Sequence, residues 1–254
     1  AGPPGTGKTF FAKNFVNYFT KTQKNYKIIQ FHPSYSYEDF VEGIRPKIED
    51  DKKSVSEFVK KSGALLEMVE DCLKNPEQKF VLIIDEINRG NISKIFGELI
   101  YLLEYRDDEI NLTYSPKEPF RLPKNLYIVG TMNTADRSIA LFDFAIRRRF
   151  AFFDFPADSN ILRQFLEKNN PGATINNSIV ELMDKINEKI TESVLGEDCR
   201  IGQSYFMKDK IWTKKRMQKV WQYEIKPLLK EYYFADKEQT IKIKEIFDSV
   251  VNNL

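Results

Sequence analysis

The first nine residues, 1–9, limit the possible folds of this chain more than any other segment. Gly2, Gly7, Lys8 and Thr9 complete the pattern G-x-x-x-x-G-K-T, which is typical of loops that bind nucleotide phosphates. Glycines in such a loop let backbone N–H groups turn toward an anion, and the lysine reaches the β- and γ-phosphates. The threonine hydroxyl is a ligand for Mg²⁺. The segment therefore predicts a nucleotide-binding α/β domain.

A helix is predicted directly after the loop, over residues 10–20. Phe11, Phe15 and Phe19 recur every four residues and so share one face of this helix. A helix N-terminus at this place adds its own N–H groups to an anion site. A phosphate loop normally follows a buried strand, and nothing precedes Ala1 here. We therefore expect a piece of a longer protein, without the first strand of its sheet.

The overall composition excludes several classes of protein. A net charge of +2 gives no general signature of nucleic-acid binding. The two cysteines cannot form a disulfide framework and suit a reducing cytosol. A single histidine excludes a histidine-rich metal site, and no apolar run approaches the roughly 18 residues of a membrane span. We expect a cytoplasmic protein without a membrane segment.

Strand and helix patterns alternate through about residue 155, which predicts a parallel sheet with crossover helices. Beyond Pro156 the patterns are helical only. We expect a three-layer α/β domain over residues 1–156 and a small all-α lid over residues 157–254. The predicted elements are strands at 27–31, 80–85, 126–131 and 151–155, helices at 64–73, 93–104, 161–168 and 179–190, and a hairpin of 110–114 with 119–122 around residues 115–117.

Two carboxylates, Asp85 and Glu86, follow the apolar run 80–84. At the carboxyl end of a parallel strand, Asp85 is expected beside Thr9, where it holds Mg²⁺ through water. Glu86 is expected to point into the nucleotide cleft and polarise the attacking water. Together with the loop, these residues predict a site for a Mg²⁺–triphosphate.

Polar residues near two later strands complete the predicted site. Asn133 follows the strand at 126–131, where a neutral amide can orient water and contact the γ-phosphate. Arg147, Arg148 and Arg149 come just before the strand predicted at 151–155. In ring-forming nucleotidases this place is the subunit edge that faces a neighbour's γ-phosphate. Arg148 or Arg149 is therefore the expected arginine finger.

These motifs resemble the AAA+ nucleotidase superfamily, and longer strings are similar to the McrB family, the nucleotidase subunits of modification-dependent restriction systems. The strings are QFHPSYSYEDFVEG at 30–43, IDEINRGN at 84–91 with FGE at 96–98, GTMNTADRS at 130–138, AIRRRF at 145–150 and RIGQSYF at 200–206. They span nearly the whole chain. The string MNTAD at 132–136 is the most diagnostic of them.

The resemblance implies a hexameric ring that hydrolyses GTP in preference to ATP, with Mg²⁺ as cofactor. It also implies an McrC-like partner that bears the nuclease, DNA cleavage powered by the ring, and a DNA-reading domain upstream of this piece. The expected catalytic residues are Lys8, Glu86, Asn133, Arg148 and Arg149, and the expected metal-binding residues are Thr9 and Asp85. The expected nucleotide-binding residues are Gly2, Pro3, Pro4, Gly5, Thr6, Gly7, Lys8, Thr9, Asp85 and Arg200, of which Arg200 reads equally well as an ordinary surface arginine.

Two other functions stay open from the sequence. One is an ATP-dependent AAA+ remodeller of the MoxR type, which acts on proteins rather than DNA. The other is a nucleotide-gated assembly scaffold, in which slow hydrolysis serves only as a timer. An intact Glu86 and the arginine run at 147–149 argue against a dead binding module.

Two positions qualify the resemblance. Residues 133–136 echo the Asn-Lys-x-Asp motif that reads guanine in small GTPases, but the lysine is absent and the position points at the γ-phosphate. Asp136 is therefore not expected to read guanine, and a role at a subunit interface is the alternative. Gln203 stands where the family usually has histidine, and glutamine cannot carry a proton near neutral pH.

Overall fold

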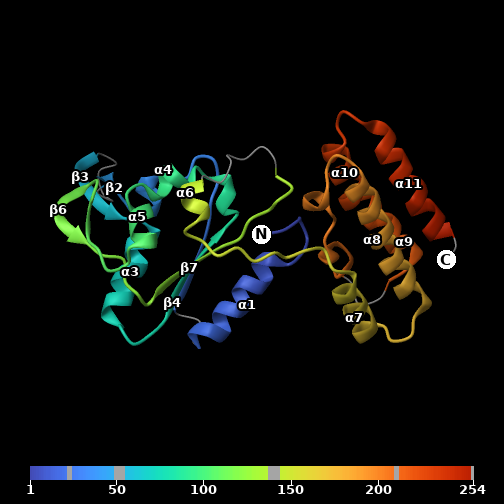
Figure 1. The fold of residues 1–254 in the computed structure, drawn as a ribbon, viewed down its shortest axis with the longest axis horizontal. Coiled ribbons are helices and arrows are strands. Elements are labelled where there is room, and N and C mark those ends of the chain that lie inside the picture. The colour runs from blue at the N-terminus through green and yellow to red at the C-terminus, as the bar shows by residue number, and fades with distance from the viewer. Residues whose placement is uncertain (22–24, 49–54, 137–143, 209–211, 253–254) are drawn as a thin grey trace. The chain divides into compact units, whose positions relative to one another are not determined.

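The computed structural model describes residues 1–21, 25–48, 55–136, 144–208 and 212–252 of the chain, which forms two compact units. The sheet unit consists of Thr9–Met132 and Ser138–Phe152, and the helical unit of Ala1–Lys8, Asn133–Arg137 and Phe153–Leu254 (Figure 1). The chain thus passes between the units more than once. The domain boundary expected between residues 156 and 157 stays a prediction.

Three parallel strands form the centre of the sheet unit, in the order β1 (Tyr26–Gln30), β4 (Phe80–Asp85) and β7 (Leu126–Gly130). The first five residues of β4 are buried, as expected of a strand covered on both faces. Ile84 lies between Ile29 and Gly130 in the register, so Asp85 stands at the carboxyl edge of the sheet. The predicted strand 80–85 is confirmed, and those at 27–31 and 126–131 are confirmed within one residue.

Helices cover both faces of this sheet. Successive side chains of β4 point to opposite faces, so alternate residues belong to two different cores. Val81 and Ile83 pack against α1 (Lys8–Thr20). Leu82 and Ile84 belong to a larger core on the other face. The helices that contribute to that core include α2 (Tyr37–Phe40), α3 (Ala64–Lys74), α4 (Ile92–Phe96), α5 (Leu99–Glu104) and α6 (Phe144–Arg147). The three-layer α/β prediction is confirmed.

The aromatic stripe of α1 contacts the sheet at one end, where Phe19 packs against Tyr127 of β7, and its other rings lie at the surface. The buried apolar residues of the helix are Ala12 and Val16. Phe11 and Phe15 are 53% and 41% exposed, and they stack along the helix with Phe19. The four-residue spacing therefore produces a stacked row of rings on the helix surface.

Residues 93–104 form two helices, α4 and α5, instead of the single helix predicted. Gly97 separates them with φ +51°, a left-handed conformation that glycine adopts without a steric penalty. Its N–H donates to the Ser93 oxygen at 3.1 Å and so closes the last turn of α4. An apolar stripe continues across this break, which is why periodicity alone predicted one helix.

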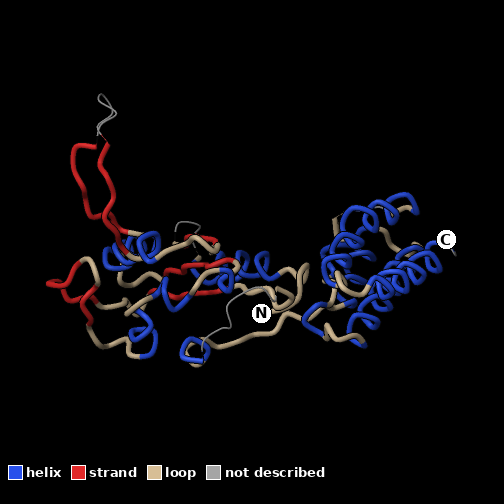
Figure 2. Tube along the Cα trace, turned by 90° about the horizontal axis from the view of Figure 1, so that it is seen from above, coloured by secondary structure: helices blue, strands red, loops and turns tan. Residues whose placement is uncertain are grey.

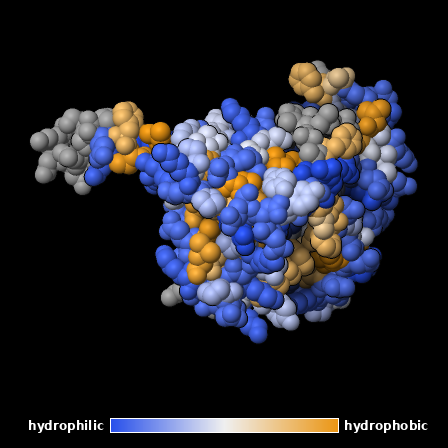
Figure 3. Space-filling model, turned by 60° about the vertical axis from the view of Figure 1, so that its left-hand side comes forward, coloured by the Kyte–Doolittle hydropathy of each residue, from blue (hydrophilic) through white to orange (hydrophobic). Residues whose placement is uncertain are grey.

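Two antiparallel hairpins extend the sheet unit. One consists of β2 (Glu42–Ile48) and β3 (Val55–Ser62), and sequence patterns did not predict it. Figure 2 shows this hairpin projecting from the rest of its unit. Its strands expose Ile44 and Phe58, at 55% and 69%. In Figure 3 the arm that ends in grey atoms carries apolar residues at its surface.

The second hairpin consists of β5 (Ile110–Leu112) and β6 (Ser115–Phe120), and its turn lies at residues 113 and 114. The turn predicted at 115–117 was therefore wrong by two residues. Pro116 suggested a turn, but it lies within β6, a strand of a two-stranded sheet. Proline is tolerated in such edge strands, where its missing N–H breaks no inner ladder.

The strand predicted at 151–155 is absent from the described part of the chain. Phe155 donates its N–H to the Ala1 oxygen at 2.8 Å, and Phe153 is 73% exposed. The Ala1 amino group also donates to the Phe153 oxygen at 2.8 Å. Two backbone bonds, both to Ala1, do not make a ladder, and exposed rings do not make a buried strand. The aromatic run at 151–155 suggested a strand that the backbone does not form.

The helical unit is a bundle around its own core. The predicted helices at 161–168 and 179–190 are confirmed as parts of longer ones. Trp221 stacks on Phe247 at 4.6 Å between ring centroids. Within the described ranges, no helix has the length and apolar character that a membrane crossing requires. The bundle consists of α7 (Ser159–Asn169), α8 (Thr174–Glu192), α9 (Lys214–Val220), α10 (Lys226–Tyr232) and α11 (Lys237–Asn252) (Figure 1).

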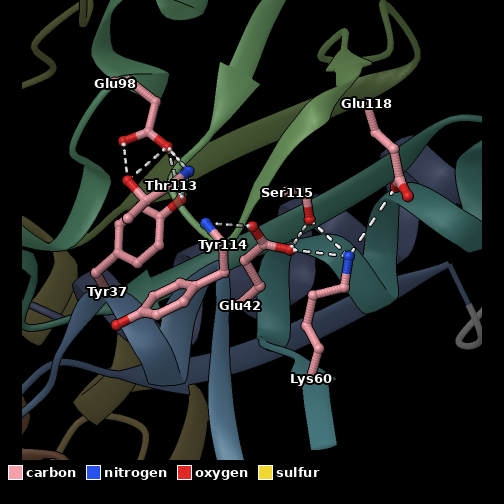
Figure 4. Close-up of polar contacts among 8 residues, drawn as sticks. All are labelled: Tyr37, Glu42, Lys60, Glu98, Thr113, Tyr114, Ser115 and Glu118. Carbon is pink, nitrogen blue, oxygen red and sulfur yellow. Dashed lines mark hydrogen bonds and ion pairs between the residues drawn. The ribbon is translucent and has the colours of Figure 1, made fainter.

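A buried carboxylate joins the two hairpins of the sheet unit. Glu42 of β2 has a side chain that is 2% exposed, and it accepts hydrogen bonds from Tyr114 N–H at 3.1 Å and Ser115 Oγ at 2.6 Å (Figure 4). Lys60 of β3 donates to the same Ser115 hydroxyl at 2.6 Å, and its Nζ lies 3.8 Å from Glu42. The turn between β5 and β6 is thereby fixed against β2 and β3.

Glu98, between α4 and α5, holds the same turn from the other side. Its carboxylate accepts bonds from Tyr37 Oη at 2.7 Å and Thr113 N–H at 2.9 Å (Figure 4). Burial, and the hydrogen bond that the neutral hydroxyl donates to Glu98, raise the pKa of Tyr37. The chain that follows Asp85 and Glu86 is thus tied to α2 and to the turn between β5 and β6.

Replacing Glu42 with alanine is expected to lower the free energy of unfolding by about 2–4 kcal/mol, because Tyr114 N–H and the Ser115 hydroxyl lose a charged acceptor. Urea denaturation followed by circular dichroism measures this loss. Glu118, whose side chain is 79% exposed and 4.0 Å from Lys60, is the matched control. Glu118→Ala is expected to stay within about 0.5 kcal/mol of wild type. An equally small effect of Glu42→Ala would contradict the buried role.

Candidate nucleotide site

The loop before α1 adopts a conformation that depends on its glycines. Gly5 and Gly7 have φ values of +78° and +89°, in the left-handed region that favours glycine. Lys8 Nζ donates to the Gly2 and Pro3 oxygens at 2.8 and 2.7 Å, so the side chain curls back over the loop. The first turn of α1 carries no acidic residue. A loop followed by such a helix start offers N–H groups and positive potential to an anion.

Asn133 lies beside the first glycine of this loop. It forms an isolated parallel bridge with Gly2, and Thr134 N–H donates to the Gly2 oxygen at 3.1 Å. The Asn133 Oδ1 accepts from Ala135 N–H at 3.3 Å. The structure thus brings two sequence-predicted site residues together, although they are 131 positions apart (133 − 2).

In the sheet unit, Asp85 joins two segments at the carboxyl end of β4. Thr9, in the first turn of α1, donates its hydroxyl to Asp85 Oδ1 at 2.7 Å. Thr131, just after β7, donates its hydroxyl to the same oxygen. Sequence reasoning predicted Thr9 beside Asp85 but missed Thr131. A hydroxyl residue at the end of the neighbouring strand was the available signal.

These oxygens make a donor set that suits Mg²⁺. The ion prefers hard oxygen ligands, keeps several waters, and commonly uses one or two protein groups besides the substrate phosphates. The hydroxyl of Thr9 and the carboxylate of Asp85 supply two such groups, already in contact with each other. The residues present therefore fit the metal that the family resemblance implies.

Glu86 adopts a backbone conformation that is rare for a residue with a side chain. Its φ and ψ are +54° and +44°, in the left-handed region, and its N–H donates to Thr131 Oγ1 at 3.2 Å. Such strain costs about 1–2 kcal/mol and concentrates at functional sites. The Glu86 side chain is 26% exposed, and its Oε2 lies 3.2 Å from Arg89 Nε. The carboxylate next to Asp85 is therefore held by local geometry. Sequence reasoning did not single out Arg89.

The two candidate arginine fingers differ in their surroundings. They follow α6 (Phe144–Arg147), and both contact Glu104, Arg149 at 2.8 Å and Arg148 at 3.3 Å. The Arg149 side chain is 9% exposed, whereas that of Arg148 is 65% exposed. Arg148 is therefore accessible to another molecule, and Arg149 is largely packed within its own unit.

The lid arginine Arg200 bonds within the helical unit. Its Nε donates to Thr191 Oγ1 and one of its terminal nitrogens donates to Glu197 Oε1, both at 2.9 Å. The guanidinium is thus engaged with lid residues in this structure. Its predicted contact with phosphate stays a prediction.

The motifs of this chain lie within two known domain families. Residues 1–150 match the AAA domain of the dynein-related subfamily, and residues 178–241 match the α-helical lid domain of McrB. The chain belongs to this AAA family. The loop, the end of β4 and Asn133 all lie within the matched part of the AAA domain. The match to the McrB lid domain, together with a 38% identical McrB subunit, confirms the resemblance to the McrB family.

Two curated relatives of this AAA protein belong to restriction systems. The Type IV methyl-directed restriction enzyme EcoKMcrB subunit of Escherichia coli (strain K12) is 38% identical over 270 aligned residues, which cover 98% of this chain and 56% of that protein. The Type II restriction enzyme BsuMI component YdiS of Bacillus subtilis (strain 168) is 28% identical over 186 residues, which cover 59% of this chain and 54% of that protein. The sequence therefore spans about half the length of these relatives.

Proposed function

We propose that this chain is the Mg²⁺-dependent nucleoside triphosphatase of an McrBC-like restriction complex, with GTP as the preferred substrate. The observation that carries the proposal is the 2.7 Å contact between the Thr9 hydroxyl and Asp85, with Glu86 next in the chain. This contact joins Thr9, which follows the loop lysine, to the carboxyl end of β4. The similarity to two restriction-system proteins supports the biological role.

Each site residue has a distinct task in this proposal. Lys8 and the N–H groups of the loop bind the phosphates, while Thr9 and Asp85 hold Mg²⁺, which neutralises phosphate charge when bound. Glu86 accepts a proton from the attacking water, and Asn133 orients that water toward the γ-phosphate.

The active form in this proposal is a homo-oligomeric ring, hexameric as in the family, at work in the cytoplasm. Arg148 is exposed and crosses to the γ-phosphate of the neighbouring subunit, where it spreads the charge of the transferring group. An McrC-like subunit supplies the nuclease, and a domain upstream of this sequence reads the DNA.

The test is a comparison of phosphate release from GTP and ATP by the full-length protein. Each nucleotide is supplied with and without Mg²⁺, modified DNA and the McrC-like partner. GTP turnover that exceeds ATP turnover and rises with partner and DNA supports the proposal. ATP turnover that responds to a protein substrate instead would favour a remodeller, and full activity with a non-hydrolysable GTP analogue would favour a scaffold.

A further inference from the structure

The lid segment 200–206 forms hydrogen bonds to the backbone of the phosphate loop, and both segments belong to the helical unit. Three consecutive lid residues bind three consecutive carbonyl groups of the loop. The bonds run from Gly202 N–H to the Pro4 oxygen at 2.9 Å, from Gln203 Nε2 to the Thr6 oxygen at 3.0 Å, and from Ser204 N–H to the Gly5 oxygen at 2.9 Å. The contact is therefore built from backbone groups and one side-chain amide.

Two glycines permit this close approach. A Cβ atom at Gly202 would lie 2.1 Å from the Gly5 carbonyl carbon and 2.4 Å from Thr6 N, which no side chain tolerates. A Cβ atom at Gly5 would lie 2.7 Å from the Tyr205 ring. Gly5 thus serves the lid contact as well as the left-handed turn of the loop.

The contact also sets the direction of the loop N–H groups. The described peptide bonds are trans, and in a trans peptide the C=O and N–H bonds point in opposite directions. Carbonyl groups held by the lid therefore leave the next N–H groups, those of Gly5, Thr6 and Gly7, pointing away from residues 202–204. N–H groups directed away from the protein backbone are what an anion site requires.

Gln203 is the side chain that connects this contact to the rest of the lid. It is 4% exposed, and while its Nε2 binds the loop, its Oε1 accepts from Asp158 N–H at 3.2 Å. Asp158 caps α7 through its bond from Asn160 N–H at 2.8 Å. One neutral amide, with a donor end and an acceptor end, thus bridges the start of α7 and the loop.

We propose that Gln203 is a positioning residue, which holds the N–H groups of the phosphate loop in their phosphate-binding orientation and couples them to α7. The inference rests on the proposed nucleotide site and adds a part to it. Methionine has nearly the length of glutamine but neither polar end. Gln203→Met is therefore expected to weaken binding of a fluorescent non-hydrolysable GTP analogue about tenfold, through loss of two hydrogen bonds.

A matched variant separates this role from a general loss of stability. Asn176 is another buried amide of the helical unit, and its Nδ2 donates to Asn170 at 2.8 Å and to Glu167 at 3.2 Å. Asn176→Leu is expected to lower the melting temperature while the analogue binds as in wild type. If both variants lose affinity in proportion to their melting temperatures, the role of Gln203 is only structural and the proposal fails.

Gln203→His supplies a second readout, because a neutral imidazole also has one donor and one acceptor. Its affinity is expected to approach that of wild type at pH 8 and to fall at pH 6, where imidazolium no longer accepts from Asp158 N–H. The ratio to wild type at each pH removes the effects of charged groups present in both proteins, such as Asp158 and Lys8. Unchanged affinity of Gln203→Met overturns the inference. Failure of wild type to bind the analogue overturns the proposed function instead.

Discussion

Replacing Glu86 with glutamine is expected to lower Mg²⁺–GTP turnover by about 10²- to 10⁴-fold, the usual contribution of a general base. Glutamine keeps the shape of the side chain but cannot accept a proton from water. Because Glu86 is not assigned to the phosphates or the metal, nucleotide affinity should change by less than about threefold. Phosphate release measures turnover, and equilibrium binding of a fluorescent analogue measures affinity.

The matched control is an exposed glutamate of the same unit. Glu77 is exposed and outside the site, so Glu77→Gln should leave both quantities unchanged. Turnover of Glu86→Gln within tenfold of wild type would remove Glu86 from the role of base. An equal loss of affinity and turnover would instead assign it to nucleotide binding.

Arg148→Ala is expected to lower turnover of the assembled protein by about 10³- to 10⁵-fold, the range measured for arginine fingers. The exposed Arg148 can reach a neighbouring subunit, whereas the nearly buried Arg149 is held by Glu104 at 2.8 Å. Arg149→Ala should therefore mainly lower stability. Steady-state turnover and melting temperature, measured on both variants, separate these two effects.

Mixing two inactive variants tests whether the finger acts between subunits. In an equal mixture of Arg148→Ala and Glu86→Gln subunits, about one seam in four combines an intact Glu86 with a neighbour's intact Arg148. Turnover should recover to about a quarter of wild type. Absence of recovery would contradict a finger in trans, and recovery by Arg149→Ala with no loss in Arg148→Ala would assign the role to the other arginine.

Local patterns were enough to predict the centre of the site. Five apolar residues followed by two carboxylates predicted a buried strand with Asp85 at its end and Glu86 next to it. The loop pattern predicted Thr9 at the start of α1. Both signals lie within a few residues, so no tertiary information was needed. The contact of Thr9 with Asp85 then follows from the general position of loops at the carboxyl edge of a parallel sheet.

Three features of the structure were not predicted from the sequence. Gln203 and Thr6 are 197 positions apart, and no local pattern announces their hydrogen bond. The β2–β3 hairpin lacks a clean apolar alternation, because its strands mix Ile44 and Phe58 with charged residues and leave both exposed. The left-handed Gly97 divided a helix whose apolar stripe is continuous. Distant contacts decide the first case, whereas the break at Gly97 is a local property of glycine that apolar periodicity does not register.

The dependence of GTP-analogue binding on Mg²⁺ tests the central claim most directly. Titration of wild-type protein with the analogue, at Mg²⁺ concentrations from zero to saturation, should show affinity that rises with Mg²⁺. Asp85→Asn, which removes the charge but keeps the shape, should lose most of that rise while it still binds the analogue weakly through the loop. Mg²⁺-independent binding by wild type, or an unchanged Mg²⁺ response in Asp85→Asn, would contradict a metal site at Thr9 and Asp85.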